Sequence, residues 1–585
     1  MKLPMIFAIL LTVLLTSCTA TAEEETAPPA TETVSGTTEP AAVSDVLRIT
    51  EGGTHTLTGS YDGMVTVDAG AEDVTLILDG AEITSTGKAA ILVKKAGTVT
   101  VTLADGSENK LTGRKGIDSA VDLLLNGGGK LTVEASEGHG IVSDASVMLA
   151  DGDYVITAAK DGVHAENEID PTLGNILLTG GNVSIVADGD GISASGTLQA
   201  DAGQFLVSAG GGAENAEPHT DDMMMGFGGG RGFFGGWEQP SAEETVETTD
   251  ETAVTSSKAL KSDGDMLLNE GMFTLDSSED TIHTNANLTV SGGTYHLSAG
   301  DDAVHADLAL TIDGGLFQIL ESYEGIEAKT IDVNGGELHV KSSDDGFNAS
   351  GGTGANRNPM AAEEGVYLTI SGGTVFVDAD GDGLDSNGDF TVNGGEVYVA
   401  GPTNSGNGAL DYGGTAAAHG GIVIAAGASG MAESFGQSST QGAIMVNTGN
   451  QEAGSEVTLT DADGNVLAEY TFDKTFSNVV ITAPGITEGG TYTLNAGTYS
   501  ETITMDGLLY GSGGGMFGGG GMNMGGGRGN GGRKDRTEWG EVPEMSEGEV
   551  PEMPMMPEGF DPGAMGGGFG GGRPGGMGGE PPQMP

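Results

Sequence analysis

Several features that stabilise or define other protein classes are scarce in this sequence. Cysteine occurs once in 585 residues, at Cys18, so no disulfide can form within the chain. Lysine and arginine together number 22, against 85 aspartates and glutamates, and the formal net charge is −63. This balance excludes nucleic acid as the natural partner, because binding a phosphate backbone requires basic side chains, and it argues against binding to anionic lipid. The composition favours a protein that gathers divalent cations, which can also replace the missing disulfides.

The apolar run that follows Lys2, over Leu3–Leu15, is too short to span a bilayer comfortably. It leads into Leu15-Thr16-Ser17-Cys18, which matches the Leu-x-x-Cys lipobox of bacterial lipoproteins. We therefore predict a lipoprotein signal peptide over residues 1–18 and lipidation of Cys18. The expected location is extracytoplasmic, as a cell-membrane lipoprotein exposed at the cell surface and held only by its lipid anchor. An ordinary cleaved signal is the alternative, and it also places the protein outside the cytoplasm.

Glycine, by contrast, is abundant at 105 residues, and pairs of glycines recur regularly. Gly-Gly pairs begin at positions 292, 314, 335, 372 and 394, so three of the four intervals are 21 or 22 residues. A second marker keeps the same period: an acidic, a small, an apolar, any and usually a small residue, as in Asp302–Ala306 and Asp345–Ala349. A period near 22 predicts one coil of a β-solenoid, whose coils bury their apolar faces only by stacking.

One coil divides into three short strands at Ile282–Thr284, Asn287–Val290 and Thr294–Ser298, with a bend at Gly292-Gly293. The predicted fold is all-β: a right-handed parallel β-helix of about 22 residues per coil, with a small C-terminal antiparallel β-sandwich-like cap and disordered tails. The predicted boundaries are a disordered tether at 19–44, the β-helix at 45–429 with a low-complexity inserted loop at 211–257, the β-rich cap at 430–505 and a Gly/Met/Pro-rich disordered tail at 506–585.

Stacked coils lie about 4.8 Å apart, so equivalent residues of successive coils become neighbours. Asp280, Asp302, Glu324 and Asp345 are expected to form one column, with a second column beside it. Like charges at this separation repel by about 1 kcal/mol in water and by several-fold more near a protein surface. Calcium is the natural counter-ion, since it takes six to eight oxygen ligands in flexible geometry. We predict calcium as the cofactor.

The densest acidic cluster, Asp378–Asp389, resembles the start of an EF-hand loop but has no flanking helices, so it predicts a calcium loop without an EF-hand. Asp-Gly is also a common turn pair, so each of these aspartates has a purely structural interpretation. The recurring His164, His283, His296 and His305 could form a transition-metal site, but exposed strand positions are the favoured interpretation. The predicted metal ligands are Asp188, Asp190, Asp280, Asp301, Asp302, Glu324, Asp344, Asp345, Asp378, Asp380, Asp382 and Asp385.

The repeated acidic-Gly-apolar-x-Ala unit, the Gly-Gly-x-apolar coil that follows it, and Gly430-Met431-Ala432 resemble a family of bacterial extracellular carbohydrate-binding β-helix lipoproteins. The resemblance covers about residues 45–500 without the inserted loop. It implies a shape similar to pectate lyases, calcium binding, and binding of cellulose and acidic polysaccharides such as polygalacturonate. For this chain it implies a carbohydrate-binding domain and a partner among plant cell-wall or acidic glycans.

Three functions remain open from the sequence: calcium-dependent, non-catalytic binding of polysaccharide, a pectate-lyase-like polysaccharide lyase, and a surface adhesin or structural protein without a sugar ligand. A lyase of that type would use calcium with an arginine base, and arginine is scarce, with Arg48, Arg114 and Arg357 in the coils. Binding without catalysis is therefore the favoured prediction, and no catalytic residue is predicted. Stacking of a neutral glucan on Tyr295, Phe376 or Tyr398 is one possible mode of binding, although these rings can equally face the core.

Overall fold

The computed structural model describes residues 32–35, 47–167, 169–219, 256–351 and 362–511. All of them belong to one unit of the chain, residues 1–519. The predicted signal peptide with Cys18, most of the tether, most of the inserted loop, Arg357 and nearly all of the tail lie outside the described residues. The described part contains β-strands and one short 3-10 helix, η1 (Ala213–Asn215), and no helix in it is long and apolar enough to cross a bilayer.

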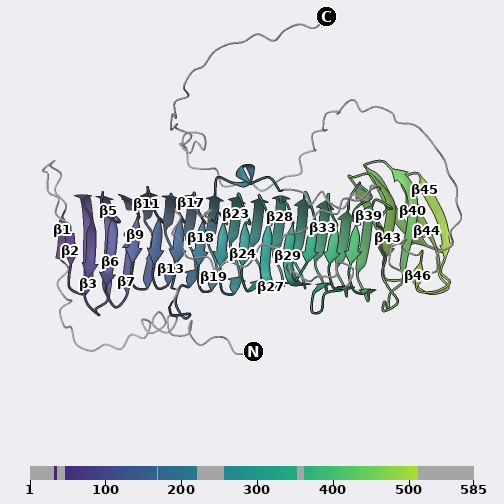
Figure 1. The fold of residues 1–585 in the computed structure, drawn as a ribbon, viewed down its shortest axis with the longest axis horizontal. Coiled ribbons are helices and arrows are strands. Elements are labelled where there is room, and N and C mark those ends of the chain that lie inside the picture. The colour runs from purple at the N-terminus through teal and green to yellow at the C-terminus, as the bar shows by residue number, and fades with distance from the viewer. Residues whose placement is uncertain (1–31, 36–46, 168, 220–255, 352–361, 512–585) are drawn as a thin grey trace, which may run out of the picture. The chain divides into compact units, whose positions relative to one another are not determined.

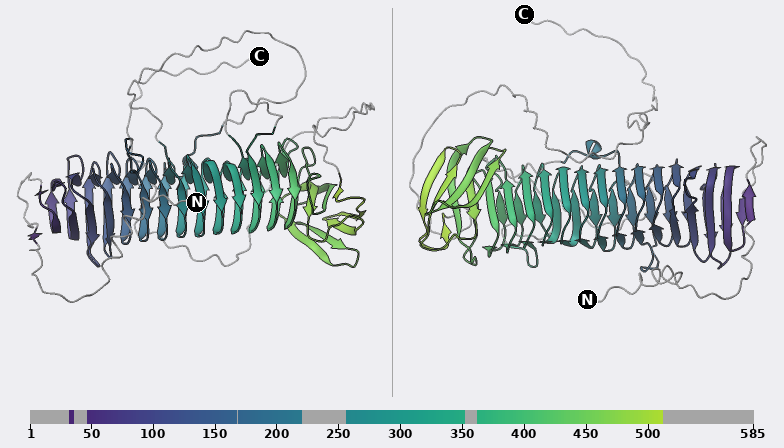
Figure 2. Two further views of the ribbon diagram at one scale, coloured as in Figure 1. Left: turned by 90° about the horizontal axis from the view of Figure 1, so that it is seen from below. Right: turned by 180° about the vertical axis from the view of Figure 1, so that it is seen from behind.

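The predicted parallel β-solenoid is confirmed, with about 14 turns (Figure 1). Each coil contributes one strand to each of three faces, and Figure 2 shows the coils stacked in the same order from two further sides. The coil divided from the sequence matches the structure closely, with strands at Ile282–Thr284, Asn287–Val290 and Thr294–Ala299. Strands β3, β5, β27 and β29 bend and take part in two faces.

The first face follows the acidic marker of each coil. Its strands are β2 (Leu47–Ile49), β4 (Val65–Asp68), β6 (Ile91–Lys95), β9 (Ile117–Ser119), β12 (Ile141–Ser143), β15 (Val163–Ala165), β18 (Ile192–Ala194), β21 (Leu260–Ser262), β24 (Ile282–Thr284), β27 (Val304–Ile312), β29 (Ile326–Val333), β31 (Phe347–Ala349), β34 (Leu384–Ser386) and β37 (Leu410–Tyr412).

The second face precedes the glycine pairs. Besides the second halves of β27 and β29, its strands are β1 (Glu32–Ser35), β3 (Gly53–Asp62), β5 (Val74–Thr84), β7 (Val99–Leu103), β10 (Leu123–Gly127), β13 (Val147–Leu149), β16 (Ile176–Leu178), β19 (Leu198–Ala200), β22 (Met266–Leu268), β25 (Asn287–Val290), β32 (Tyr367–Ile370), β35 (Asp389–Val392) and β38 (Ala416–Ala418).

The third face follows the glycine pairs and completes each coil. Besides the ends of β3 and β5, its strands are β8 (Glu108–Gly113), β11 (Lys130–Ala135), β14 (Asp153–Ala158), β17 (Asn182–Ala187), β20 (Gln204–Ala209), β23 (Met272–Ser277), β26 (Thr294–Ala299), β28 (Leu316–Glu321), β30 (Glu337–Ser342), β33 (Thr374–Ala379), β36 (Glu396–Ala400) and β39 (Ile422–Gly427).

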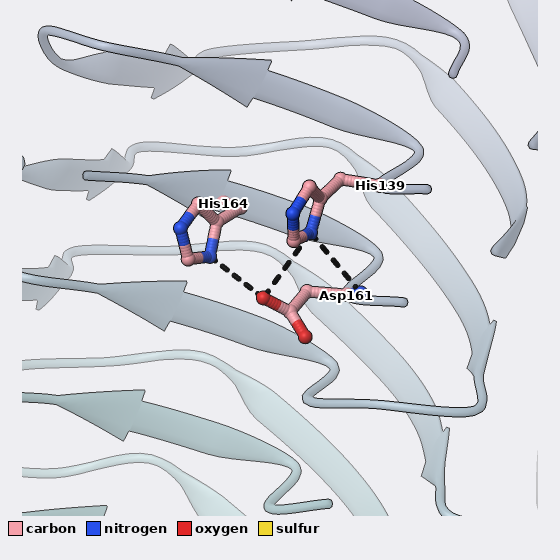
Figure 3. Close-up of side chains that lie close together, drawn as sticks. All are labelled: His139, Asp161 and His164. Carbon is pink, nitrogen blue, oxygen red and sulfur yellow. Dashed lines mark hydrogen bonds and ion pairs between the residues drawn. The ribbon is translucent and has the colours of Figure 1, made fainter. Parts of the chain in front are cut away.

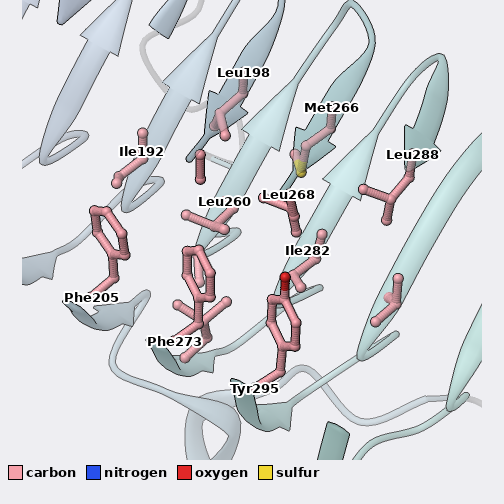
Figure 4. Close-up of a cluster of buried hydrophobic side chains, with 14 of the residues drawn as sticks. Ile192, Leu198, Phe205, Leu260, Met266, Leu268, Phe273, Ile282, Leu288 and Tyr295 are labelled. Carbon is pink, nitrogen blue, oxygen red and sulfur yellow. The ribbon is translucent and has the colours of Figure 1, made fainter. Parts of the chain in front are cut away.

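Side chains alternate in and out along these strands, as in Val99–Leu103, where valine and leucine are buried and threonine is not. The inward side chains of successive coils stack into rows (Figure 4). In one row Phe205, Phe273, Tyr295 and Phe317 stack with ring centroids 5.0, 5.0 and 4.4 Å apart. Each stacked aromatic pair adds about 0.5–1.5 kcal/mol beyond the burial of its area. Parallel register therefore repeats a favourable contact at every coil.

The solenoid ends in an antiparallel cap, also as predicted. Strand β43 (Phe476–Thr482) pairs antiparallel with β39, so the last edge of the third face is covered and cannot pair with another chain. Strand β40 (Ala443–Gln451) pairs with β43 and with β46 (Leu509–Tyr510). The cap thus continues past the predicted boundary at residue 505. Its second sheet is β42 (Val466–Phe472), β41 (Ser455–Asp461), β44 (Thr491–Ala496) and β45 (Tyr499–Thr504).

Candidate functional site

The turn between the third and the first face, which we call the acidic corner, carries one charged or histidine side chain in each coil from His139 to Asp382. This residue lies two positions before each first-face strand, and the register of those strands places successive copies side by side. We call this row the corner column. Its members from His139 onward are His139, Asp161, Asp190, Lys258, Asp280, Asp302, Glu324, Asp345 and Asp382.

In addition to the pairing of the strands, hydrogen bonds from backbone N–H groups hold the carboxylates of the column in place. The backbone N–H of Asp190 donates to Asp161 Oδ1 at 2.9 Å, and that of Asp302 donates to Asp280 Oδ1 at 3.1 Å. The N–H of Asp382 donates in the same way to Asp345 Oδ1 at 2.6 Å. One carboxylate oxygen of these residues is thus occupied by the next coil, and the other is left for a cation.

From Asp161 to Asp280 the second oxygen meets a basic side chain. Asp161 Oδ2 lies 2.6 Å from His164 Nδ1, Asp190 Oδ2 lies 3.4 Å from Lys261 Nζ, and Asp280 Oδ2 lies 2.7 Å from His283 Nδ1. Lys258, itself a column member, lies 3.2 Å from Asp280. We call Asp161, Asp190 and Asp280 the cation-paired run.

The pKa values of Asp280 and Asp161 follow from burial and pairing. Burial raises the pKa of Asp280, but the hydrogen bond from His283 and the Lys258 ammonium outweigh it and hold that pKa at about 2. Burial acts in the same way on Asp161, whose pKa is nevertheless well below its ordinary value because His139 and His164 both face the carboxylate. These carboxylates are therefore ionised and already neutralised by the protein.

Asp302 marks a transition along the column. It pairs with His305 at 2.7 Å, and the same imidazole lies 3.1 Å from Glu327 and 3.1 Å from Asp307. Burial lowers the pKa of His305, but the surrounding carboxylates outweigh it and raise that pKa to about 11. Ligand atoms of Asp280, Asp301 and Asp302 also lie within 4.8 Å of one another, which makes them an all-carboxylate group of the kind that calcium takes.

Beyond Asp302 the basic partners stop. Glu324, Asp345 and Asp382, which we call the cation-free run, form no ion pair with a lysine, arginine or histidine among the described residues, and Glu324 accepts only from the Asn348 amide at 2.8 Å. Burial first, and then repulsion by neighbouring carboxylates, raises the pKa of Glu324 to about 7 and that of Asp345 to about 9. The pKa of Asp382 is raised to about 7, mainly by burial. Such carboxylates must take up protons or bind cations.

The remaining predicted ligands are spread over different positions. Asp188 is exposed, and Asp344 lies in the column beside Asp345. Asp385 is on β34 next to Asp411 of β37. Asp378 and Asp380 lie 2.7 and 2.9 Å from Lys474 Nζ of the cap. The predicted calcium loop at 378–389 is therefore not one loop, because the strand β33, the corner and the strand β34 aim its aspartates in different directions.

Two column members were missed from the sequence. His139 and Lys258 occupy positions where the marker has an acid. The sequence His139-Gly140-Ile141-Val142-Ser143 is a degenerate copy of the marker and could have indicated the first, whereas the insertion before residue 258 interrupts the period and hid the second.

The opposite turn, between the second and the third face, forms a groove. It has a volume of about 740 Å³ and crosses six successive coils, which is about 24 Å at the strand spacing. Glycines form much of its floor: a Cβ on Gly127, at φ +105°, would lie 2.1 Å from the Leu103 carbonyl oxygen, and one on Gly180 would lie 2.2 Å from that of Ala150. The polar groups of the groove are Asp105, Asp151, Asp153, Asn182 and Gln204, and Met272 contributes a half-exposed apolar side chain.

The aromatic residues suggested for stacking on glucan are not presented for it. Tyr295 is fully buried in the core. Phe376 and Tyr398 face outward from the third face, but their rings stack on each other at 5.3 Å. Tyr470 of the cap stacks on Tyr398 at 4.4 Å and lies tilted to Phe376 at 6.0 Å. The faces of these rings therefore pack between the cap and the solenoid.

The two described arginines, Arg48 and Arg114, do not face the cation-free run. Arg48 forms an ion pair with Asp68, and Arg114 lies 2.6 Å from Glu137, while Arg357 is outside the described residues. The described coils thus offer no arginine base next to these carboxylates.

Comparison with known proteins relates the coils of the solenoid to a protein family. A model for a family described as carbohydrate-binding domain-containing proteins matches residues 44–170, 112–303 and 309–408, which together are more than half of the chain. The chain belongs to this family. The matched residues run from β2 through β36, so family membership rests on the solenoid with its two corners and not on the cap.

A carbohydrate-binding domain-containing protein of Acetivibrio thermocellus is 33% identical over 128 residues, which are 19% of this chain and 45% of the relative. The chain therefore spans less than half the length of that relative. A solved structure described as a polysaccharide lyase-like protein from C. thermocellum, as a gadolinium derivative, is 21% identical and covers 46% of this chain and 89% of its own. Its TM-score of 0.29 is too low to carry an argument.

Proposed function

We propose that the protein binds polysaccharide without catalysis and does so outside the cytoplasm. We also propose that calcium bound at the acidic corner stabilises the solenoid that binds the polysaccharide. The observation that carries the calcium part is the cation-free run. Glu324, Asp345 and Asp382 are largely buried beside further carboxylates and have no basic partner among the described residues. A divalent ion with oxygen ligands removes this repulsion without removing the carboxylates.

We propose a calcium site at the Asp280, Asp301 and Asp302 group, because it alone among the described groups of converging ligands consists only of carboxylates. An ion there would share Asp280 with its basic partners Lys258 and His283. Asp301 is the accessible member, with 45% of its side chain exposed, so it can admit the ion. The cation-free run, which begins at Glu324 one coil after Asp302, provides the other locus.

For the glycan we propose the groove at the glycine corner. Its length spans several sugar units, and its carboxylates and amides suit the hydroxyl groups of a neutral chain such as a glucan. Asn182 Nδ2 already donates to Asp153 Oδ1 across adjacent coils at 2.7 Å, so a polar contact pair is held in place. An acidic chain would need calcium to bridge its carboxylates to Asp105, Asp151 and Asp153.

The family description supports binding, and the surroundings of the arginines support the absence of lyase chemistry. We also propose that the protein is anchored at the cell surface through a lipid on Cys18, which rests on the lipobox of the sequence.

A retention assay on insoluble cellulose and on immobilised polygalacturonate tests the function, with the full chain in calcium or in chelator. We expect retention on at least one matrix in calcium, loss in chelator, and no release of unsaturated product from pectin. Asp153→Ala combined with Asn182→Ala should weaken retention about tenfold, and Asn287→Ala, exposed on the second face outside the groove, is the matched control. Product formation would favour a lyase, and no retention on either matrix would contradict the proposal.

A further inference from the structure

A second kind of cation site lies at the N-terminal part of the acidic corner, around His139, Asp161 and His164 (Figure 3). His139 and Asp161 are consecutive members of the corner column, and His164 is on β15 in the same coil as Asp161. The two imidazole rings stack with centroids 4.5 Å apart and an angle of 19°. One ligand atom from each of these three side chains lies within 4.8 Å of the other two, and Asp161 Oδ2 lies 2.6 Å from His164 Nδ1 and 3.3 Å from His139 Nδ1.

The nitrogen of His139 nearest this centre carries its lone pair and not the ring hydrogen, and a metal ion would take this lone pair in place of a long backbone contact. The backbone N–H of Asp161 donates to His139 Nδ1 at 3.3 Å, so this nitrogen is an acceptor. The same nitrogen lies 3.3 Å from Asp161 Oδ2, which can only accept as well.

His164 also points its Nδ1 toward this centre, and Glu166 holds the ring in that orientation. Its Nε2 lies 3.1 Å from Glu166 Oε2, and since a carboxylate accepts, Nε2 carries the hydrogen of the neutral ring. The lone pair of Nδ1 then points toward Asp161 Oδ2, 2.6 Å away, and this buried nitrogen has no properly directed hydrogen bond. Asp161 cannot turn away, because its Oδ1 accepts the N–H of Asp190.

Three acceptors therefore converge on one point, and a positive centre must lie between them. A proton on His164 is one way to satisfy them, and a metal ion is the other. Two imidazole nitrogens with one carboxylate oxygen suit zinc and similar transition-metal ions, whereas calcium prefers oxygen alone. Tetrahedral zinc with bonds of about 2.0–2.1 Å separates its ligand atoms by about 3.3 Å. The contact between His139 Nδ1 and Asp161 Oδ2, at 3.3 Å, needs no change, and the contact between His164 Nδ1 and Asp161 Oδ2, at 2.6 Å, must open.

The supporting contacts have the form found around metal-bound histidines. Glu166 holds His164 through the nitrogen that would not bind the metal, and the Asp190 N–H holds Asp161. The other mixed groups on the corner lack this vacancy for a metal. The Lys258 ammonium lies 3.2 Å from Asp280 and already supplies a positive charge to the group of Asp280, His283 and His305. The group of Asp302, His305 and Glu327 has one imidazole and two carboxylates, so it lacks the second histidine that suits a zinc-class ion.

We propose that His139, Asp161 and His164 form a binding site for one zinc-class divalent ion, with the fourth ligand position open to solvent. This site is separate from the proposed calcium sites in residues and in chemistry, and it does not depend on the binding of polysaccharide.

Isothermal titration of zinc into the metal-stripped full chain, in excess calcium to occupy the carboxylates, tests the proposal. The expected result is one zinc per chain with affinity reduced at least tenfold in His139→Ala and in His164→Ala. His419→Gln, a change at an exposed histidine near the end of the solenoid, should leave it unchanged. The visible spectrum of the cobalt-loaded protein should change in both corner variants, while melting curves check that they fold. No zinc binding by the wild type in calcium, or equal binding by folded corner variants, would overturn the site and leave a protonated histidine pair in its place.

Discussion

The cation-paired run and the cation-free run occupy equivalent positions along one corner column. The repulsion between their stacked carboxylates is nevertheless compensated in different ways. In the cation-paired run, histidine and lysine side chains from the same or adjacent coils neutralise Asp161, Asp190 and Asp280. In the cation-free run, Glu324, Asp345 and Asp382 keep the same backbone positions without such partners. The fold dictates that these carboxylates stack, and the sequence of each coil decides whether the chain or the solvent supplies the positive charge.

The two runs should therefore respond oppositely to changes of charge. Removing a basic partner from the cation-paired run leaves a buried charge unpaired, which is costly. Removing a carboxylate from the cation-free run relieves repulsion and also removes a ligand for calcium.

The largest effect is expected from Lys258→Met. Lys258 is largely buried and lies 2.8 Å from Glu279 and 3.2 Å from Asp280, so its loss leaves Asp280 with the two histidines His283 and His305 alone to neutralise it. We expect a loss of about 3 kcal/mol of unfolding free energy, measured by urea denaturation. Lys88→Met, a change at an exposed lysine of the same corner, should stay within about 0.5 kcal/mol. Equal effects of the two changes would mean that pairing does not stabilise the column.

The next effect concerns pH in the metal-free protein. The raised pKa values of Glu324, Asp345 and Asp382 mean that the folded state holds protons that the unfolded state has released. Their contribution is fully present below about pH 4 and is lost as the pH rises through about 7 to 9, so stability should fall on the order of 1–3 kcal/mol over this range. Asp161 and Asp280, with lowered pKa values, contribute stability above about pH 4 that is lost on acidification below it.

Melting temperatures in chelator from pH 5 to 9 measure this slope. Asp345→Asn combined with Asp382→Asn should flatten it, because an asparagine keeps the Oδ1 that accepts the backbone N–H but cannot ionise. An unchanged slope in this double variant would place the pH dependence elsewhere in the chain.

A smaller effect is expected from Asp301→Asn at the proposed calcium group. Asp301 is half exposed, and its replacement removes one of three carboxylates, so the affinity for calcium should fall about fivefold to tenfold, or about 1 kcal/mol. Asp188→Asn is the control, since Asp188 is an exposed predicted ligand outside the column. Calcium titration followed by calorimetry compares the two, and identical affinities would exclude Asp301 as a ligand.

Much of the solenoid could be predicted from the sequence because parallel stacking repeats itself in every coil. The strands Ile282–Thr284 and Asn287–Val290 have the predicted limits, and the register that aligns Asp280, Asp302, Glu324 and Asp345 follows from the same period. A repeat fixes which residues are neighbours along the stack, and this is why the acidic column could be found without a structure.

The partners of the column could not be predicted in the same way. Lys258 follows a long insertion that interrupts the period, and Lys474 reaches Asp378 and Asp380 from the cap, about one hundred residues away in sequence. The period also cannot tell that Phe376 and Tyr398 are covered, because Tyr470 belongs to an element outside the repeat. Contacts between the coils and the cap or the insertion involve residues outside the repeat, so the repeat pattern does not predict them. The binding of calcium, the lipid on Cys18 and the glycan all stay predictions.

The most direct test of the account is a calcium titration of the metal-stripped full chain at pH 8, followed by thermal melting. At this pH much of the cation-free run should be ionised, and calcium about 100-fold above its dissociation constant should raise the melting temperature by several degrees, about 3–8 °C. The Asp345→Asn and Asp382→Asn double variant should start from a higher melting temperature in chelator and lose most of this rise. A wild-type protein that melts at the same temperature in calcium and in chelator would contradict the claim that the stacked carboxylates bind calcium.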